Sequence, residues 1–195
     1  MKNGSSAQAL VVIDVQQGFD DLDYWGPTTN AGCEANVARL LECWRGEGRG
    51  PIVVVRHDSV EPGSPLRPGQ PGHQLKDIVT GGSYDLLVTK TVNSAFLGEP
   101  GLADWLRDRA ITTIVCCGLQ TNMCVETTAR MGGNLGFQVI VPLDATRTFD
   151  LARQLPDGSE DRIAAADLMR VTAVNLQGGG FATVVGTDDL CAPRV

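Results

Sequence analysis

Six short segments of this chain are continuously apolar and rich in Val and Ile, and they are separated by polar or amphipathic stretches. Continuous runs of this kind are typical of parallel strands whose two faces are both buried. The pattern therefore predicts six strands, over residues 9–13, 52–55, 85–89, 113–117, 137–141 and 181–185.

Between these runs, apolar residues recur at the three- and four-residue spacing of helices, which predicts helices over 34–44, 102–109, 122–135 and 160–176. Alternating strands and helices imply right-handed crossovers and a parallel sheet. We therefore expect one α/β domain over 1–195, a doubly wound, mostly parallel six-stranded sheet with helices on both faces. Ligands in such folds bind outside the carboxyl ends of the strands.

One segment departs from the alternation. Residues 57–83 are rich in proline and glycine, so they form neither a helix nor a short passive connection. Two interpretations remain open at this point, a lid or binding loop and a surface excursion that serves an oligomer contact.

Composition narrows the class of protein. The chain has 195 residues, of which 43% are hydrophobic and 20% charged, as expected for a folded globular protein. The net charge of -7 argues against a partner made of nucleic acid. The sequence holds no apolar run long enough for a membrane helix and no secretory signal pattern, so we expect a cytoplasmic protein with a small-molecule substrate.

The six cysteines form no C-x-x-C motif, and the only histidines are His57 and His73. This inventory argues against a structural zinc site. In a reducing compartment we expect buried thiols, with one of them reactive.

Three predicted strands end in residues that suit nucleophilic chemistry. Asp14 closes the first run, Lys90 closes the third, and Cys124 follows the fourth through a turn into a helix. If the three meet, Lys90 would favour the thiolate of Cys124, and Asp14 would accept the thiol proton and return it to a leaving group.

Each of these residues, taken alone, could instead have a purely structural role. Asp14 could cap a turn, Lys90 could extend to solvent, and Cys124 could be a core thiol. For the whole chain, the alternatives are a non-catalytic binding module and a redox protein that uses Cys116, Cys117 and Cys124. Adjacent cysteines in one strand point to opposite faces, which makes Cys116 and Cys117 poor disulfide partners.

The sequence also resembles a known family, the isochorismatase-like cysteine hydrolases, which include nicotinamidases, N-carbamoylsarcosine amidohydrolase and streptothricin hydrolase. The resemblance lies in VVIDVQQGF at 11–19, KTVNSAF at 90–96 and GLQTNMCVETTARMGGNLGFQVIVPLDAT at 118–146, with PGSPLRPGQPG at 62–72 similar to a common loop. These pieces keep the order and spacing of the family over nearly the whole chain.

The resemblance implies a catalytic triad of Asp14, Lys90 and Cys124 that works through a thioester intermediate. It implies a cis peptide bond between Leu119 and Gln120, and an oxyanion hole made by the backbone N–H groups of Gln120 and Cys124. It also places Phe19 and Leu119 against the substrate, with core packing as the alternative role of Phe19. Members commonly form homo-oligomers, so a dimer or tetramer is expected.

Departures from the family pattern limit which of the family's reactions we expect of this chain. Nicotinamidases of the family hold a metal through D-x-H, whereas this chain reads R-H-D-S at 56–59, so we expect no metal and no cofactor, with His57 supporting the loop or lining the pocket entrance. A cysteine at position 124 favours cleavage of the C–N bond of a small amide, ureido compound or lactam. The alternative is ether hydrolysis of the isochorismatase type, which needs no cysteine nucleophile.

One charged segment bears on the substrate. Asp20, Asp21 and Asp23 precede Tyr24 and Trp25. If these aspartates border the pocket, they would favour a cationic or amine-bearing substrate; otherwise they form a solvated acidic loop.

Overall fold

A seven-stranded sheet forms the centre of the protein, whose computed structural model describes residues 7–192. Six strands lie side by side in the order β3-β2-β1-β4-β5-β9 with every pairing parallel, and a short seventh strand, β6, pairs with the end of β4. The strands are β1 (Gln8–Ile13), β2 (Ile52–His57), β3 (Leu86–Lys90), β4 (Thr113–Leu119), β5 (Gln138–Pro142), β6 (Thr146–Arg147) and β9 (Thr183–Val185). All six predicted strands are present, and β6 is the one strand of this sheet that the sequence pattern did not predict.

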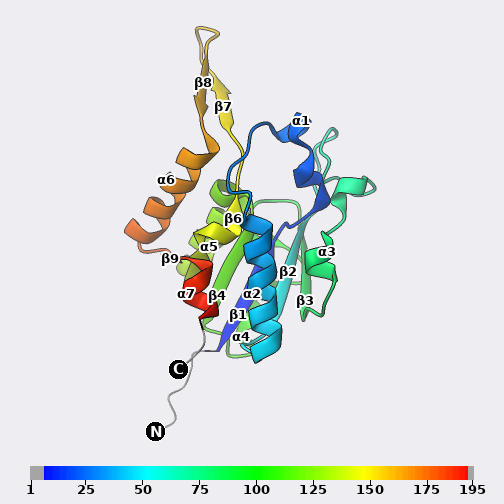
Figure 1. Ribbon diagram of the computed structural model, residues 1–195, viewed down its shortest axis with the longest axis vertical. Coiled ribbons are helices and arrows are strands. Elements are labelled where there is room, and N and C mark those ends of the chain that lie inside the picture. Colours follow the sequence, from blue (N-terminus) through cyan, green and yellow to red (C-terminus); the bar gives the residue numbers. More distant parts are fainter. Residues whose placement is uncertain (1–6, 193–195) are drawn as a thin grey trace.

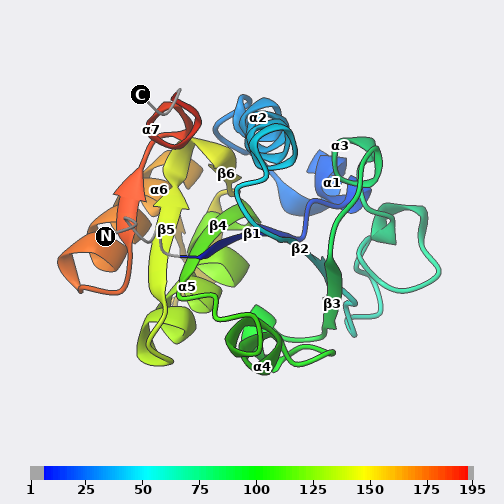
Figure 2. The same ribbon diagram turned by 90° about the horizontal axis from the view of Figure 1, so that it is seen from below.

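Helices cover both faces of this sheet, as predicted, and Figure 2 shows the two layers. One layer contains α2 (Cys33–Glu47), α3 (Asp77–Thr80) and α7 (Thr187–Cys191), and the other contains α4 (Leu102–Arg107), α5 (Glu126–Asn134) and α6 (Ala165–Gly178). Single turns occupy the connections: η1 (Gln17–Asp20), α1 (Leu22–Trp25), η2 (Pro71–His73), η3 (Ala95–Leu97), η4 (Thr121–Val125) and η5 (Leu143–Ala145). Within residues 7–192, no helix combines the length and hydrophobicity needed to cross a bilayer.

The core lies on both sides of β1, because successive side chains of a strand point to opposite faces. Val11 and Ile13 pack with the α4 and α5 side, whereas Leu10 and Val12 pack with the α2 side. All four side chains are completely buried. This double burial explains why β1 is a continuous apolar run rather than an alternating one.

An antiparallel hairpin projects from the body of the molecule, at the top of Figure 1. It consists of β7 (Leu151–Gln154) and β8 (Glu160–Ile163), and its side chains are exposed or half-buried. The predicted helix over 160–176 is therefore wrong at its start, and α6 begins only at Ala165. There the Asp150 carboxylate accepts a hydrogen bond from the Ala165 backbone N–H at 2.8 Å, which satisfies a free donor at the helix start.

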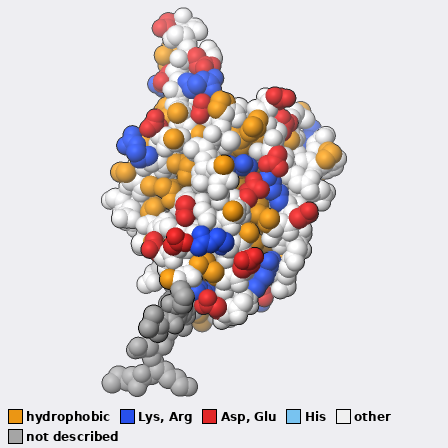
Figure 3. All heavy atoms as spheres, viewed as in Figure 1, with side chains coloured by type: hydrophobic (Ala, Val, Ile, Leu, Met, Phe, Trp, Pro, Cys, Tyr) orange, Lys and Arg blue, Asp and Glu red, His pale blue; other side chains and the backbone are white. Residues whose placement is uncertain are grey.

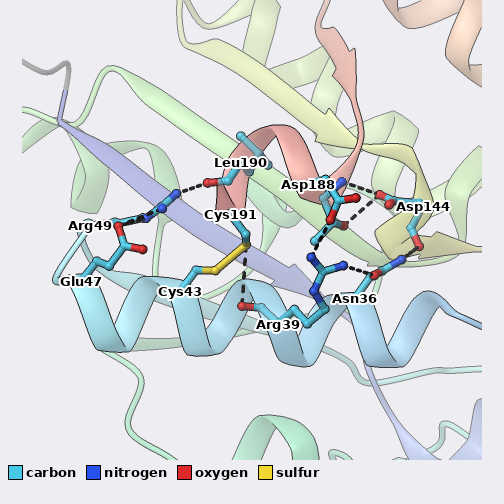
Figure 4. Close-up of a disulfide and its surroundings, with 10 residues drawn as sticks. Asn36, Arg39, Cys43, Glu47, Arg49, Asp144, Asp188, Leu190 and Cys191 are labelled. Atoms are coloured by element: carbon cyan, nitrogen blue, oxygen red, sulfur yellow. Dashed lines mark hydrogen bonds and ion pairs between the residues drawn. A yellow bond between two sulfur atoms is a disulfide. The ribbon is translucent and has the colours of Figure 1, made fainter. Parts of the chain in front are cut away.

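A disulfide joins Cys43 of α2 to Cys191 of α7 and fixes the last helix to the first layer (Figure 4). An ion pair between Arg39 of α2 and Asp188 of α7 also joins the two helices. The expectation of thiols throughout is therefore wrong for this pair, whose members lie 148 residues apart in sequence. The other four cysteines are free and buried.

Candidate active site

Three side chains from three different strand ends meet at the carboxyl edge of the sheet. Asp14 follows β1 directly, Lys90 is the last residue of β3, and Cys124 lies in η4, the turn that follows β4. The Lys90 ammonium nitrogen lies 2.6 Å from Asp14 Oδ2 and 3.3 Å from the Cys124 sulfur. The Asp14 and Lys90 side chains are completely buried, and Cys124 is 8% exposed. The structure thus brings together the three residues that the sequence singled out.

The strand order explains this convergence. The chain builds β2 and β3 on one side of β1 and the remaining strands on the other, so the order reverses between β1 and β4, where α/β sheets open a crevice for ligands. Asp14 leaves β1 with a φ of 52°, and its backbone N–H donates to the Val55 carbonyl at 2.9 Å. This local turn directs the carboxylate toward the crevice instead of into a further strand pairing.

The charges in this cluster depend on one another. Burial raises the pKa of the Cys124 thiol to about 12, with the negative charge of Asp14 acting in the same direction and the ammonium of Lys90 opposing both. Burial alone would lower the pKa of Lys90, but Asp14 and Cys124 outweigh it and the pKa is raised above its ordinary value. The resting site therefore holds a protonated thiol beside an ammonium–carboxylate pair.

His57 is the fourth member of the cluster. Its Nδ1 lies 3.1 Å from the Lys90 ammonium nitrogen, and its ring lines the cavity described below, as expected. Burial and the positive charge of Lys90 lower the pKa of His57, so the ring is neutral at pH 7 and accepts a hydrogen bond from Lys90. The buried Gln16 side chain fixes the His57 backbone, accepting from its N–H at 2.8 Å and donating to its carbonyl at 3.1 Å.

Asp14, His57 and Cys124 each offer a metal-ligating atom, and these atoms lie within 4.8 Å of one another. The Lys90 ammonium, however, contacts the side chains of all three residues. The Lys90 ammonium is therefore the cation that these three groups bind. A divalent ion at the same place would be repelled by the positive charge of Lys90. The donor set fits an ammonium better than a metal ion.

A cavity of about 380 Å³ opens above the cluster. Asp14 and Cys124 lie at its base together with Asn93, whose side-chain oxygen is 3.8 Å from the Cys124 sulfur. Gln120 and Asn122 also border it, at the turn that carries Cys124. The nucleophile predicted from sequence therefore faces space large enough for a small molecule.

Aromatic rings form one wall of this cavity. Phe19 and Phe149 are stacked with ring centroids 6.0 Å apart, and Trp25 lies 4.9 Å from the first and 5.5 Å from the second. Tyr24 meets Trp25 edge to face at 4.8 Å. Phe19 thus lines the cavity and also packs in the core, so the two roles considered for it are compatible.

The acidic segment 20–23 lies elsewhere. Asp20 binds the Lys76 ammonium at 2.5 Å, and Asp21 accepts a hydrogen bond from the Tyr24 backbone N–H at the start of α1. None of Asp20, Asp21 and Asp23 lines the cavity. The hypothesis that these aspartates border the pocket is therefore wrong, because neighbouring cations and a helix start engage two of them.

The turn before Cys124 contains a cis peptide bond between Leu119 and Gln120, as the resemblance implied. The Leu119 side chain, however, is completely buried in the core on the α2 side and does not line the cavity. The expected substrate contact of Leu119 is therefore wrong for its side chain, because Leu119 is the last residue of a strand buried on both faces. Gln120, the next residue, does line the cavity.

The Pro/Gly-rich segment 57–83 borders the cavity through Ser59, Glu61, Ser64 and Leu66. Of its two interpretations, the binding loop is the one that fits this position. The loop is anchored by His73, whose Nε2 lies 2.7 Å from the Asp58 carboxylate.

Sequence reasoning missed several cavity residues, notably Asn93, Asn122, Phe149 and Asp150. Asn93 and Asn122 each lie within three residues of Lys90 or Cys124, so proximity to the strand ends was the available signal. Phe149 and Asp150 follow β6, which is too short to give a periodic pattern.

The chain matches known proteins over most of its length. The model of the isochorismatase domain matches residues 8–174. The uncharacterized isochorismatase family protein YrdC of Bacillus subtilis is 38% identical over 94% of this chain and 94% of its own length. A streptothricin hydrolase of Streptomyces noursei is 34% identical over 82% of this chain, which is a match to 61% of that protein. A crystal structure of a putative isochorismatase-family hydrolase from Chromobacterium violaceum has a TM-score of 0.85 at 38% identity, covering 98% of this chain and 95% of that one.

The parallel α/β sheet and the family model define the class of the protein as isochorismatase-like. The chain belongs to the isochorismatase family of hydrolases.

Proposed function

We propose that this protein is a cysteine hydrolase that cleaves a C–N bond of a small amide, ureido compound or lactam. The observation that supports this most directly is the Lys90 ammonium, which contacts both the Asp14 carboxylate and the Cys124 sulfur at the base of a cavity. A buried carboxylate, an ammonium and a thiol in mutual contact supply a base, a charge stabiliser and a nucleophile. A family relative named as a streptothricin hydrolase supports hydrolysis as the reaction class.

In the first half of the reaction, Asp14 takes the proton of the Cys124 thiol while Lys90 stabilises the thiolate. The sulfur attacks the carbonyl carbon and forms a C–S bond, and the carbonyl electron pair moves onto oxygen. Backbone N–H groups of Gln120 and Cys124 stabilise this oxyanion. When the tetrahedral species collapses, the C–N bond breaks, nitrogen leaves with the proton held by Asp14, and a thioester remains on Cys124.

In the second half, Asp14 takes a proton from water, whose oxygen attacks the thioester carbon. The C–S bond breaks, the sulfur recovers the proton from Asp14, and a carboxylic acid is released. The net change is addition of one water across the C–N bond, and each half returns Asp14 to its starting state. No step requires a metal ion, consistent with the ammonium that occupies the centre of the donor cluster.

We further propose that the protein works as a homodimer or homotetramer. Exposed Val171 and Val174 on α6, together with Leu151 and Ile163 at the base of the hairpin, offer apolar surface that a second copy would cover. These residues belong to adjoining segments of the chain. Light scattering of the purified protein tests this assembly.

The activity is tested by product analysis over small amides, ureido acids, cyclic amides and isochorismate. Mass spectrometry follows each reaction, so that lactam opening, which releases no ammonia, is detected. Turnover should disappear in Cys124→Ala and persist in Cys33→Ala, since Cys33 is a buried free cysteine that does not line the cavity. An acyl adduct on Cys124 in quenched reactions identifies the thioester.

Two outcomes would contradict the proposal. Turnover of isochorismate that survives Cys124→Ala would move the chemistry to Asp14 and to ether hydrolysis. Binding of small amides without any turnover would favour a non-catalytic member of the family.

A further inference from the structure

The charged groups around the cavity are unevenly distributed. Its lining includes the acidic residues Glu61 and Asp150 in addition to Asp14 at the base, and it includes no arginine or lysine among residues 7–192. The charge of Asp14 is matched by Lys90 below it. Glu61 and Asp150 have no such cation in the lining, so the upper part of the cavity carries negative charge.

Two arginines that neighbour lining residues in the sequence, Arg56 and Arg147, are already paired with carboxylates that do not line the cavity. The Arg147 guanidinium, which lies against Phe149, is 3.2 Å from the Glu34 carboxylate and 3.6 Å from that of Asp20. Arg56 binds Asp58 at 2.9 Å. His57 is neutral at pH 7 for the reasons given above.

The same cavity presents aromatic rings. Trp25 and Tyr24 are only partly buried, and both line the cavity together with the rings of Phe19 and Phe149. The face of an aromatic ring is electron-rich and attracts ammonium and guanidinium groups, with Trp the strongest partner. The carboxylates and the ring faces therefore both favour a cationic ligand, through two different kinds of interaction.

We propose that the substrate carries a cationic group, an ammonium or guanidinium, which the Glu61 and Asp150 carboxylates and the ring of Trp25 bind while Cys124 faces the bond to be cleaved. This inference rests on the proposed function for the reaction, but the binding step is independent of turnover. It also predicts discrimination against carboxylate substrates such as isochorismate, because no guanidinium of the described residues lines the cavity to receive them.

The test measures how well small probes protect Cys124 from alkylation by iodoacetamide, which is uncharged, with the modified peptide quantified by mass spectrometry. The three probes are n-butylammonium, 1-butanol and butyrate, which have similar size and differ in charge. Butylammonium should protect at a concentration about 3- to 10-fold lower than butanol, and butyrate should protect least.

Variants identify the groups responsible. Glu61→Gln, Asp150→Asn and Trp25→Leu should each weaken protection by butylammonium while leaving protection by butanol much less affected. Asp150→Asn keeps an oxygen that can accept from Ala165 N–H, so the start of α6 is preserved. Asp23→Asn is the matched control, since Asp23 is an exposed aspartate beside Tyr24 that does not line the cavity, and it should change nothing.

Equal protection by the three probes, better protection by butyrate, or no protection by any of them would overturn the proposal. A second series, 4-aminobutanamide, pentanamide and succinamate, compares hydrolysis of amides that differ in the same way. Selective protection by butylammonium with no hydrolysis of any amide would retain the cation site and reject the proposed reaction. Hydrolysis of all three amides with no preference for charge would retain the proposed reaction and reject the cation site.

Discussion

The Lys90 ammonium lies 2.6 Å from the Asp14 carboxylate, with both side chains completely buried. Burial raises the pKa of the Cys124 thiol most, the negative charge of Asp14 raises it further, and the ammonium of Lys90 lowers it. Replacing Asp14 by Asn should therefore lower the pKa of Cys124. The substitution removes the negative charge that raises this pKa and keeps the Lys90 ammonium that lowers it. Alkylation by iodoacetamide at pH 8 should become faster, while hydrolysis should fall about 10²- to 10⁴-fold because the general base is gone.

The opposite responses of alkylation and turnover separate this mechanism from simple unfolding, which would expose every buried cysteine. Quantifying Cys33 and Cys116 in the same samples provides that control, because both are buried and free. Slower alkylation of Cys124 in Asp14→Asn would show that the carboxylate activates the thiol in the resting enzyme rather than suppressing its ionisation.

His57 makes the stability of the protein depend on pH. Burial and Lys90 lower its pKa below the ordinary value of 6.5. Below pH 6.5 the unfolded chain binds a proton that the folded protein does not, so the free energy of unfolding should fall as the pH drops through this value. His57→Asn, whose amide oxygen can accept from Lys90, should lose less stability between pH 7 and pH 5.5.

Urea unfolding at the two pH values measures this difference. The comparison uses the change within each variant, so any constant cost of the substitution cancels. Equal losses in the wild-type protein and His57→Asn would mean that another group is responsible for the acid sensitivity.

Much of the fold and the centre of the site were predictable from the sequence because the same physical cause produces both. Strands buried on two faces are continuous apolar runs, and the residues that end such runs must lie at one edge of a parallel sheet. Asp14 and Lys90 end such runs and Cys124 follows one through a turn, so the sequence predicts their convergence. The aromatic wall was harder to predict, since Phe149 follows a two-residue strand without a periodic pattern.

The hairpin was missed although its signal was present. Pro156, Asp157 and Gly158 form a turn sequence of the kind that joins two strands, and Gly158 has a φ of 85°. The flanking strands are exposed and carry charged residues, as Figure 3 shows at the top of the molecule, so no apolar alternation marks them. The disulfide could not be predicted because a pairing across 148 residues depends on the packing of α7 against α2.

The disulfide between Cys43 and Cys191 should stabilise the protein by about 2–4 kcal/mol, because it closes a long loop and restricts the unfolded chain. Adding a reductant should therefore lower the melting temperature of the wild-type protein. The Cys43→Ser/Cys191→Ser variant should melt at the lower temperature with or without reductant. A shift of equal size in that variant would assign the effect of the reductant to another cause.

The same bond bears on the cytoplasmic location predicted from sequence. Disulfides persist in oxidising compartments and are rare in the cytoplasm of most cells. Differential alkylation of Cys43 and Cys191 in intact cells measures whether these residues are thiols or form the disulfide, and so whether the protein's compartment is reducing or oxidising. Thiols at both positions would support the cytoplasmic prediction, and a disulfide would contradict it.

Gly118 should be indispensable for the geometry at the end of β4. It has a φ of 112°, it pairs with Ile13 of β1, and a Cβ at this position would overlap the Ile13 carbonyl oxygen. Gly118→Ala should therefore cost about 3 kcal/mol or more, since backbone strain and a backbone clash act together. Gly136 is the matched control, with a φ of 90° and open space around its Cβ position, so Gly136→Ala should cost only about 1–2 kcal/mol. Urea unfolding measures both, and equal costs would show that φ alone, not the close approach of β1 and β4, makes glycine necessary at position 118.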